Sequence, residues 1–149
     1  MNINKIIISF FVISLLAFGL QTFSQEQTKD PWTAEQLIAP TELVSILKSK
    51  TSENYFIYNI GPSGQIKNAK DIGEGKHKVN VEKLRNETEQ LSRDANILIY
   101  CGCCPFKDCP NIRPTFSLLN EMNFTNHKLL NLPQNLKVDW IEHGYPMNE

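Results

Sequence analysis

Cysteine is absent from most of the chain: there is none before position 101 and none after position 109. The four cysteines that the chain does have lie within nine consecutive positions: Cys101, Cys103, Cys104 and Cys109. A disulfide framework of the kind that holds small secreted domains together spreads its cysteines along the sequence, so this distribution argues against one. Four thiols in one short segment instead predict a functional site there.

An excess of basic residues is also missing. The chain has 15 Lys and Arg residues against 16 Asp and Glu residues, a formal net charge of −1. Nucleic-acid-binding domains usually carry a basic patch, so we expect no nucleic-acid partner. The sequence shows no serine-triad signature, no glycine-rich phosphate loop and no convincing pair of catalytic carboxylates. Its 149 residues suffice for one domain with a sizeable core, and no internal repeat suggests a second.

The start of the chain has the layout of an exported protein. Residues 1–5 carry one positive charge, residues 6–20 carry none, and Thr22 and Ser24 lie three and one positions before a possible cleavage point. We therefore expect a signal peptide over residues 1–24 and a periplasmic or secreted location, where disulfides can persist. The alternative is an uncleaved membrane anchor, although the apolar run is shorter than the roughly 20 residues that cross a bilayer comfortably. Any membrane contact would then be limited to this segment.

The rest of the chain alternates between strand and helix patterns. We predict a leader and edge segment over residues 25–40 and one domain over residues 41–149. The patterns indicate strands at residues 32–38, 55–60, 96–100 and 128–132. They indicate helices at residues 41–50, 80–91 and 136–143, and a further helix that starts between 111 and 115 and ends at 122. Residues 65–78, between the second strand and the second helix, are predicted to be irregular. Such alternation is typical of an α/β domain with a largely parallel sheet.

Several single residues also carry predictions. Thr41 and Asn80 have the side chains preferred at helix N-caps, and we expect them to start the first two helices. Trp32 and Trp140 are expected in the core or at its rim. No histidine is spaced as a metal-ligand pair with a cysteine, and we expect all three at the surface: His77, His127 and His143.

Residues 96–100 predict the central strand of the sheet. Four consecutive positions, 97–100, are Ile, Leu, Ile and Tyr, which is typical of a strand buried on both faces. Cys101 then lies at the carboxyl end of a parallel strand, where open α/β sheets usually place ligands and chemistry. Backbone N–H groups of residues 102–111 and the start of the next helix would face its sulfur, which stabilises a thiolate and lowers its pKa. Lys107 and Arg113 would add positive charge for an anionic sulfur donor.

Other interpretations of the cysteines remain open. A lone cysteine at a strand end is usually a small buried hydrophobe, which fits four clustered cysteines poorly. The pattern C-x-C-C-x4-C supplies enough thiolates for zinc, but structural zinc sites usually draw on two separated knuckles, so we expect no resident metal and no other cofactor. Cys104 and Cys109 could instead pair as a disulfide across Pro105, leaving Cys101 free and supplying a resolving thiol.

The sequence resembles the rhodanese-like domain family. The run Ile-Leu-Ile-Tyr-Cys at 97–101, with the loop and helix after it, looks like the active-site segment of that family. Residues 139–146, Asp-Trp-Ile-Glu-His-Gly-Tyr-Pro, look like the helix that closes such domains. The loop Cys-Gly-Cys-Cys-Pro-x3-Cys-Pro-Asn resembles a cysteine-rich subgroup. The chain differs from the usual family motifs at Asn59 and Gly61, and Arg113 follows Cys101 by twelve residues rather than closing a short loop.

This resemblance implies a three-layer α/β sandwich with a central, largely parallel sheet flanked by helices. It also implies a cysteine that accepts a sulfane sulfur from a donor such as thiosulfate and passes it to a nucleophile. Cys101 matches the persulfide-forming residue, and three residues would hold the anionic donor: Gly102, Lys107 and Arg113. The other thiols would be structural, resolving or sulfur-relaying: Cys103, Cys104 and Cys109.

We therefore expect an exported sulfurtransferase that acts on a small sulfur-donor anion and a thiol or cyanide-like acceptor. Two alternatives belong to other functional classes. One is a non-catalytic thiol module that binds a soft metal such as zinc or copper. The other is a redox protein that exchanges disulfides.

Overall fold

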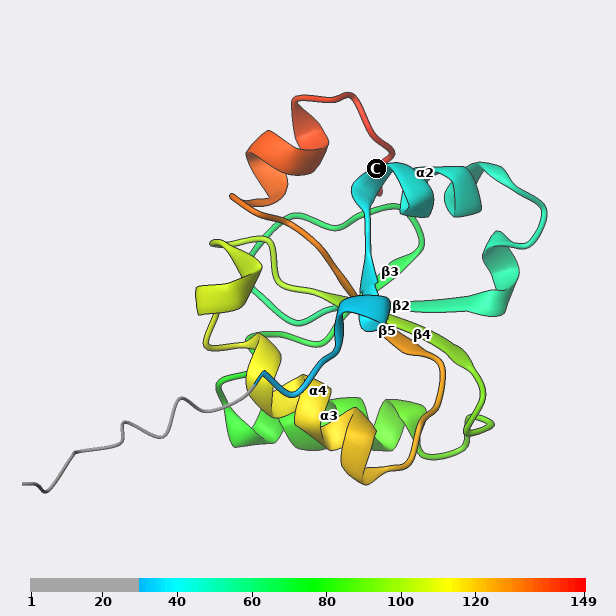
Figure 1. Cartoon of the computed structure of the whole chain (residues 1–149), viewed down its shortest axis with the longest axis vertical. Helices are drawn as coiled ribbons and strands as arrows, with labels where there is room; N and C mark the ends of the chain where they lie inside the picture. Colours follow the sequence, from blue (N-terminus) through cyan, green and yellow to red (C-terminus); the bar gives the residue numbers. More distant parts are fainter. Residues whose placement is uncertain (1–29) are drawn as a thin grey trace, which may run out of the picture.

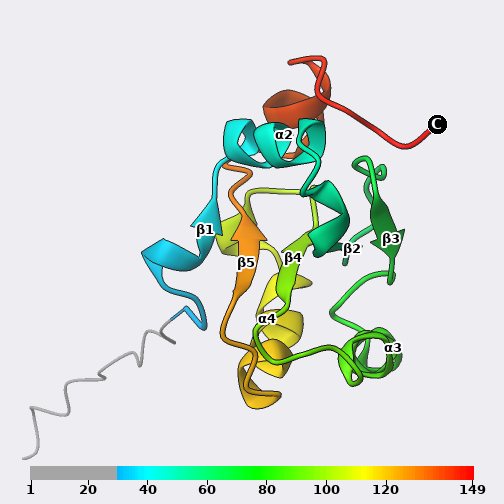
Figure 2. The same ribbon diagram turned by 90° about the vertical axis from the view of Figure 1, so that its right-hand side faces the viewer.

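The computed structural model describes residues 30–149 and contains a sheet of five strands. The strands are β1 (Leu37–Ile38), β2 (Tyr55–Asn59), β3 (Ala69–Asp71), β4 (Asn96–Tyr100) and β5 (His127–Leu130). Their order across the sheet is β1-β5-β4-β2-β3, and every neighbouring pair is parallel, so β4 is the central strand (Figure 2). The predicted α/β architecture is confirmed. The predicted signal segment, residues 1–24, lies outside the described residues.

Helices cover both faces of the sheet and complete a three-layer sandwich (Figure 1). One face carries α2 (Pro40–Lys48) and a short π-helical turn, Lys137–Ile141, and the other carries α3 (Lys78–Thr88) and α4 (Ile112–Glu121). Between residues 30 and 149 there is no helix with both the length and the apolar character to cross a membrane.

The central strand is buried on both faces, as predicted from its sequence. Ile97, Ile99 and Cys101 belong to the core under α3 and α4. Leu98 and Tyr100 belong to the core under α2. All five side chains are at most 1% exposed. Because successive side chains of a strand point to opposite faces, Cys101 projects into the layer that contains α4.

The predicted starts of the first two helices are wrong. The first helix begins at Pro40 rather than after Thr41, because proline at the first helical position has a suitable fixed φ and needs no hydrogen-bond donor there. The second helix begins two residues before Asn80. The side-chain amide of Asn80 instead donates a hydrogen bond of 2.9 Å to the carbonyl oxygen of Glu74, in the preceding loop.

His127 is buried, so the prediction that all three histidines lie at the surface is wrong. It is the first residue of β5 and is 2% exposed, and its ring centroid lies 4.6 Å from that of Phe116. Burial lowers the pKa of its imidazole, and its Nε2 lies 3.2 Å from the side-chain amide nitrogen of Gln36. The other two histidines are exposed. Trp32 and Trp140 are both buried, as predicted.

Candidate functional site

Cys101 follows β4 directly, and the loop after β2 closes over it. A Cβ atom at Gly61 would lie 2.3 Å from the Sγ of Cys101 and 2.6 Å from its carbonyl oxygen. No side chain fits in that space, so the glycine is what allows the two loops to touch. From the same loop, the hydroxyl of Ser63 donates a hydrogen bond to the carbonyl oxygen of Cys101. The thiol is therefore enclosed, and its residue is only 1% exposed.

The cysteine loop is fixed at its base by the segment that follows β5. The carbonyl oxygen of Gly102 accepts a hydrogen bond of 2.9 Å from the N–H of Leu136, and the N–H of Phe106 donates one of 3.1 Å to the carbonyl oxygen of Leu132. Gly102 has a φ of +75°, which favours glycine. The side chain of Phe106 is 6% exposed and belongs to the core. These contacts make the loop an ordered part of the fold.

The four sulfur atoms converge within this loop. The Sγ of Cys103 lies 3.2 Å from that of Cys101, 3.1 Å from that of Cys104 and 3.9 Å from that of Cys109. All four thiols are free, so the Cys104–Cys109 disulfide, one of the alternatives left open by the sequence, is not formed in this structure. Cys101 and Cys109 are buried, Cys104 is half-buried and Cys103 is exposed. Cys103 therefore connects the buried thiols with solvent.

The pKa of the Cys101 thiol is lowered from its ordinary value of 9.0 to about 6. The largest cause is a hydrogen bond from the Cys109 thiol, and the backbone N–H of Cys103 and the side-chain amide of Asn111 add to it against the opposing effect of burial. Hydrogen bonds to a charged form favour that form. Cys101 is therefore a thiolate at neutral pH, which is the nucleophilic and metal-binding state of cysteine.

Two neighbouring thiols, those of Cys103 and Cys109, keep their protons. Burial, followed by the effects of Cys104 and Cys101, raises the pKa of Cys103 to about 12. The hydrogen bond that Cys109 donates to Cys101, together with burial, raises the pKa of Cys109 above its ordinary value. The group of sulfurs therefore carries one negative charge, and this charge is located on Cys101.

Asn111 is a member of the site that the sequence did not single out. It directly precedes α4 and is 2% exposed. Its Nδ2 donates a hydrogen bond of 3.2 Å to the Sγ of Cys101, while its Oδ1 accepts one of 3.1 Å from the backbone N–H of Lys76. The second contact fixes the orientation of the amide, so that its N–H group points at the thiolate. The sequence predicted backbone donors from residues 102–111, but gave no signal for this side chain.

The two cations predicted to bind the donor have other contacts. Arg113 forms an ion pair of 2.6 Å with Asp30, and its guanidinium carbon lies 5.1 Å from the ring centroid of Trp32. It also donates a hydrogen bond of 3.1 Å to the carbonyl oxygen of Lys107. The ammonium of Lys107 lies 6.0 Å from the ring centroid of Phe106. The structure therefore brings Gly102 and the four cysteines together, whereas Arg113 and Lys107 bond to no thiol among residues 30–149.

A different lysine lines the same cavity as the exposed thiol. Cys103 lines an open cavity of about 410 Å³ together with Gly102, Ser63, Asn135, Lys137 and Ile141. Lys107 lines a separate cavity of about 620 Å³, which includes none of the thiols. The cavity beside Cys103 is large enough for a small anion, and Lys137 is the lysine in its lining, although its ammonium also forms a long ion pair of 4.0 Å with Glu142.

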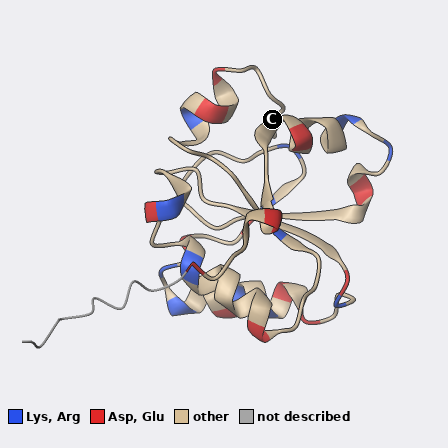
Figure 3. Ribbon diagram, in the orientation of Figure 1, with Lys and Arg blue, Asp and Glu red and all other residues tan. Residues whose placement is uncertain are grey.

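Lys76 is a second lysine near the sulfurs, and its ammonium forms an ion pair of 2.5 Å with Glu74. Its pKa is raised mainly by the hydrogen bond with Glu74 and to a smaller extent by the negative charge of the cysteine site. Elsewhere, basic and acidic residues are interspersed over the ribbon (Figure 3), in keeping with a net charge of −1. The positive charge at the site is thus local rather than part of a basic surface.

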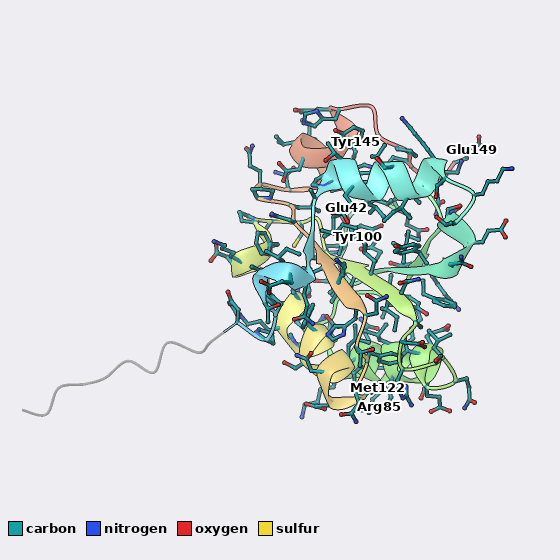
Figure 4. The ribbon with its side chains drawn as sticks, turned by 45° about the vertical axis from the view of Figure 1, so that its right-hand side comes forward. Glu42, Arg85, Tyr100, Met122, Tyr145 and Glu149 are labelled. Atoms are coloured by element: carbon teal, nitrogen blue, oxygen red, sulfur yellow. The ribbon has the colours of Figure 1, made fainter. Side chains whose placement is uncertain are left out.

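Tyr100 supports the other side of the cavity. Its side chain lies in the interior beneath α2 (Figure 4) and is fully buried. Its hydroxyl accepts a hydrogen bond of 2.9 Å from the N–H of Ile66 and donates one of 3.1 Å to the carbonyl oxygen of Gly64. These bonds fix the loop after β2, which carries Gly61 and Ser63 against Cys101.

No protein-family model matches the sequence, and no curated protein matches it either. The function has therefore to be derived from the site itself.

Proposed function

We propose that this protein is a sulfurtransferase that carries a sulfane sulfur as a persulfide on Cys101, as in the rhodanese-like domains that its sequence resembles. The observation that carries the proposal is the set of donors around one sulfur. The Sγ of Cys101, at the carboxyl end of the central strand, accepts a hydrogen bond of 3.2 Å from the side-chain amide of Asn111 and lies 3.2 Å from the Sγ of Cys103. The Cys109 thiol and the backbone of Cys103 also lower the pKa of Cys101. The charge-free run at residues 6–20 supports an exported location for this chemistry.

The proposed first step is the attack of the Cys101 thiolate on the sulfane sulfur of thiosulfate. A bond forms between the two sulfurs, the sulfur–sulfur bond of thiosulfate breaks, and sulfite leaves with the bonding electron pair. The product is a persulfide anion, whose charge the same donors stabilise. An acceptor thiolate or cyanide then takes the outer sulfur, and the Cys101 thiolate is regenerated. No net oxidant is required, because the sulfane sulfur keeps its oxidation state in both transfers.

We assign Cys103 the role of relay between Cys101 and the cavity. Its sulfur is exposed and lies 3.2 Å from that of Cys101. A thiol of low pKa is the better leaving group in exchange reactions, which suits Cys101, while Cys103 can attack only as it gives up its proton. In that transfer the proton of Cys103 passes to the outer sulfur, and Cys101 returns to its thiolate. The acceptor then meets the sulfur in the cavity.

The proposal is tested by intact mass. The reduced protein is exposed to thiosulfate beside Cys101→Ser, with Cys104→Ser as a variant of the same loop. We expect the parent and Cys104→Ser to gain one sulfur atom that cyanide removes, and Cys101→Ser to gain none. No gain in the parent, or an equal gain in Cys101→Ser, would refute the assignment.

Disulfide exchange is a second candidate, which one observation favours. A thiolate at Cys101 lies 3.2 Å from the protonated thiol of Cys103, an arrangement that also suits formation of a reversible disulfide. A redox protein of this kind would lose the mass of two hydrogen atoms on mild oxidation, with the two electrons passing to the added oxidant. It would regain that mass with a thiol reductant and would take no sulfur from thiosulfate. The same mass measurement therefore distinguishes the two functions.

A further inference from the structure

We propose that Cys101, Cys103 and Cys109 form a binding site for one soft monovalent metal ion, and that Cu⁺ is the ion that suits it. The three Sγ atoms all lie within 4.8 Å of one another. This inference goes beyond sulfur transfer and does not rest on it, although it uses the same thiols.

The spacing of the sulfurs fits a single ion placed between them. A metal bound in a plane at about 2.3 Å from each of three thiolates would hold the sulfurs about 4 Å apart. The Cys103–Cys109 separation is 3.9 Å and the Cys101–Cys103 separation is 3.2 Å. Small side-chain adjustments would therefore complete the triangle, without any movement of the sheet. One loop thus carries all three sulfur ligands, although the sequence led us to expect that a metal site would need two separated segments.

The donor set favours a soft ion with three ligands. Within residues 30–149, no carboxylate or imidazole belongs to the group, so it offers only sulfur. Thiolates select soft ions such as Cu⁺ over hard ions such as Mg²⁺ or Ca²⁺. Structural zinc sites are almost always tetrahedral with four ligands. The sulfur of Cys104 lies 3.1 Å from that of Cys103 but falls outside the mutually close group of three, which leaves a trigonal set.

The surroundings provide both an entry path and positioned donors. Cys103 is exposed and lines the open cavity, so an ion can reach it first and then pass to the buried sulfurs of Cys101 and Cys109. The Nδ2 of Asn111 lies 3.2 Å from the Sγ of Cys101 and 4.0 Å from that of Cys103, where it orients two of the three ligands. Such supporting hydrogen bonds commonly tune metal affinity.

Binding requires no electron transfer, because copper enters and stays as Cu⁺. Every coordinating sulfur must be a thiolate, so each thiol that joins the ion releases its proton to solvent. Three thiolates and one Cu⁺ leave a net charge of −2 at the site. Lys137 lines the adjoining cavity, and Lys76 responds electrostatically to the cysteines, while each of these ammonium groups also forms an ion pair with a glutamate.

The test is a competition titration of the whole reduced protein without oxygen and without any sulfur donor. Cu⁺ is supplied as its bicinchoninate complex, and loss of the chelator's colour reports transfer to the protein. We expect one equivalent of Cu⁺ per chain. Cys103→Ser should weaken Cu⁺ binding by at least about 100-fold. Loss of a hydrogen bond to a ligand typically lowers metal affinity by about 10–100-fold, and loss of the ligand itself should cost more. Cys104→Ser should change it by less than about 3-fold.

Cys109→Ser should also lose the site, and its circular dichroism is recorded because Cys109 is buried and its replacement can disturb the fold. Cys103 is exposed, so the comparison of Cys103→Ser with Cys104→Ser decides the question even if Cys109→Ser does not fold. The proposal is overturned if the parent takes no Cu⁺, if Cys104→Ser loses as much affinity as Cys103→Ser, or if Zn²⁺ displaces Cu⁺ at equal concentration. Because the readout is chelator colour, a failure of sulfur transfer leaves this result unaffected.

Discussion

The side-chain amide of Asn111 donates a hydrogen bond to the Sγ of Cys101 across 3.2 Å. The same amide is fixed by the backbone N–H of Lys76, on a loop that follows β3. Residues far apart in the sequence thus combine to set the charge of one sulfur. This relationship can be tested with a substitution that changes one atom of the contact and little else.

We expect Asn111→Asp to raise the pKa of Cys101 by about one unit or more, because a carboxylate oxygen replaces the donor and places a like charge beside the thiolate. In metal-free protein, the rate of alkylation by iodoacetamide reports the thiolate fraction as a function of pH. The parent profile should have its midpoint near 6, and the variant's should lie higher. Asn86→Asp makes the same change at an exposed position of α3 and should leave the midpoint in place.

The lowered pKa of Cys101 also predicts how stability depends on pH. The thiol has a pKa of about 6 in the folded protein and an ordinary value of 9.0, so the unfolded chain binds more protons between these values. The contribution to stability is therefore complete above pH 9 and is lost as the pH falls through 6. The difference in free energy of unfolding between the parent and Cys101→Ser should therefore grow as the pH rises from 6 to 9. Urea unfolding under reducing conditions measures it, and a flat difference would contradict the assigned pKa.

Gly61→Ala should destabilise the protein, because its Cβ would lie 2.3 Å from the Sγ of Cys101. Overpacking of this kind typically costs about 1–3 kcal/mol, and we expect a loss in that range on urea unfolding. Gly64→Ala is the matched control, since its nearest contact is the flexible end of Met147 at 3.1 Å. That variant should change the free energy of unfolding by less than about 0.5 kcal/mol. Equal losses in the two variants would show that Gly61 has no special role.

Lys137→Gln should slow sulfur uptake from thiosulfate, because it removes the cation that lines the cavity beside Cys103. Electrostatic attraction of a small anion is strongest at low salt, so the effect should shrink as the ionic strength rises. Lys107→Gln removes the same charge from a different cavity and should leave the rate unchanged. Initial rates of mass gain measure both. A larger effect at Lys107 would restore the role that the sequence had suggested for it.

Tyr100→Phe should weaken the loop that closes over the thiol. The variant leaves the N–H of Ile66 without its buried acceptor, a loss that typically costs about 1–3 kcal/mol. Tyr55→Phe serves as the control, because the structure gives the hydroxyl of this half-buried residue no hydrogen bond within residues 30–149. Thermal unfolding of both variants should show a lower midpoint for Tyr100→Phe alone.

The sequence predicted the parts of the fold that depend on local pattern. Residues 96–100 have the bounds of β4, because a run of four large apolar residues leaves few alternatives for a central strand. The helix before Asn123 ends as expected, and Asn123 has a φ of +60°. The three-residue strand β3 lies within residues 65–78, which the sequence predicts to be irregular, because one buried residue in three is too weak a pattern.

The composition of the site was harder to predict than its place. The cluster of cysteines marked the loop, but the direction of a side chain depends on contacts that are distant in sequence. Arg113 follows the loop closely yet pairs with Asp30, whereas Lys137 lies 34 residues after Cys103 and lines its cavity. The burial of His127 likewise comes from packing against Phe116, for which a lone histidine gives no signal.

The two hydrogen bonds that fix the base of the cysteine loop, at Gly102 and Phe106, join main chain to main chain. They depend on the path of the backbone and hardly at all on which side chains the loop carries between them. The backbone that positions the loop is in this sense independent of the thiols that the loop carries. A lineage with this fold could therefore add, remove or rearrange thiols while the sheet beneath remained the same.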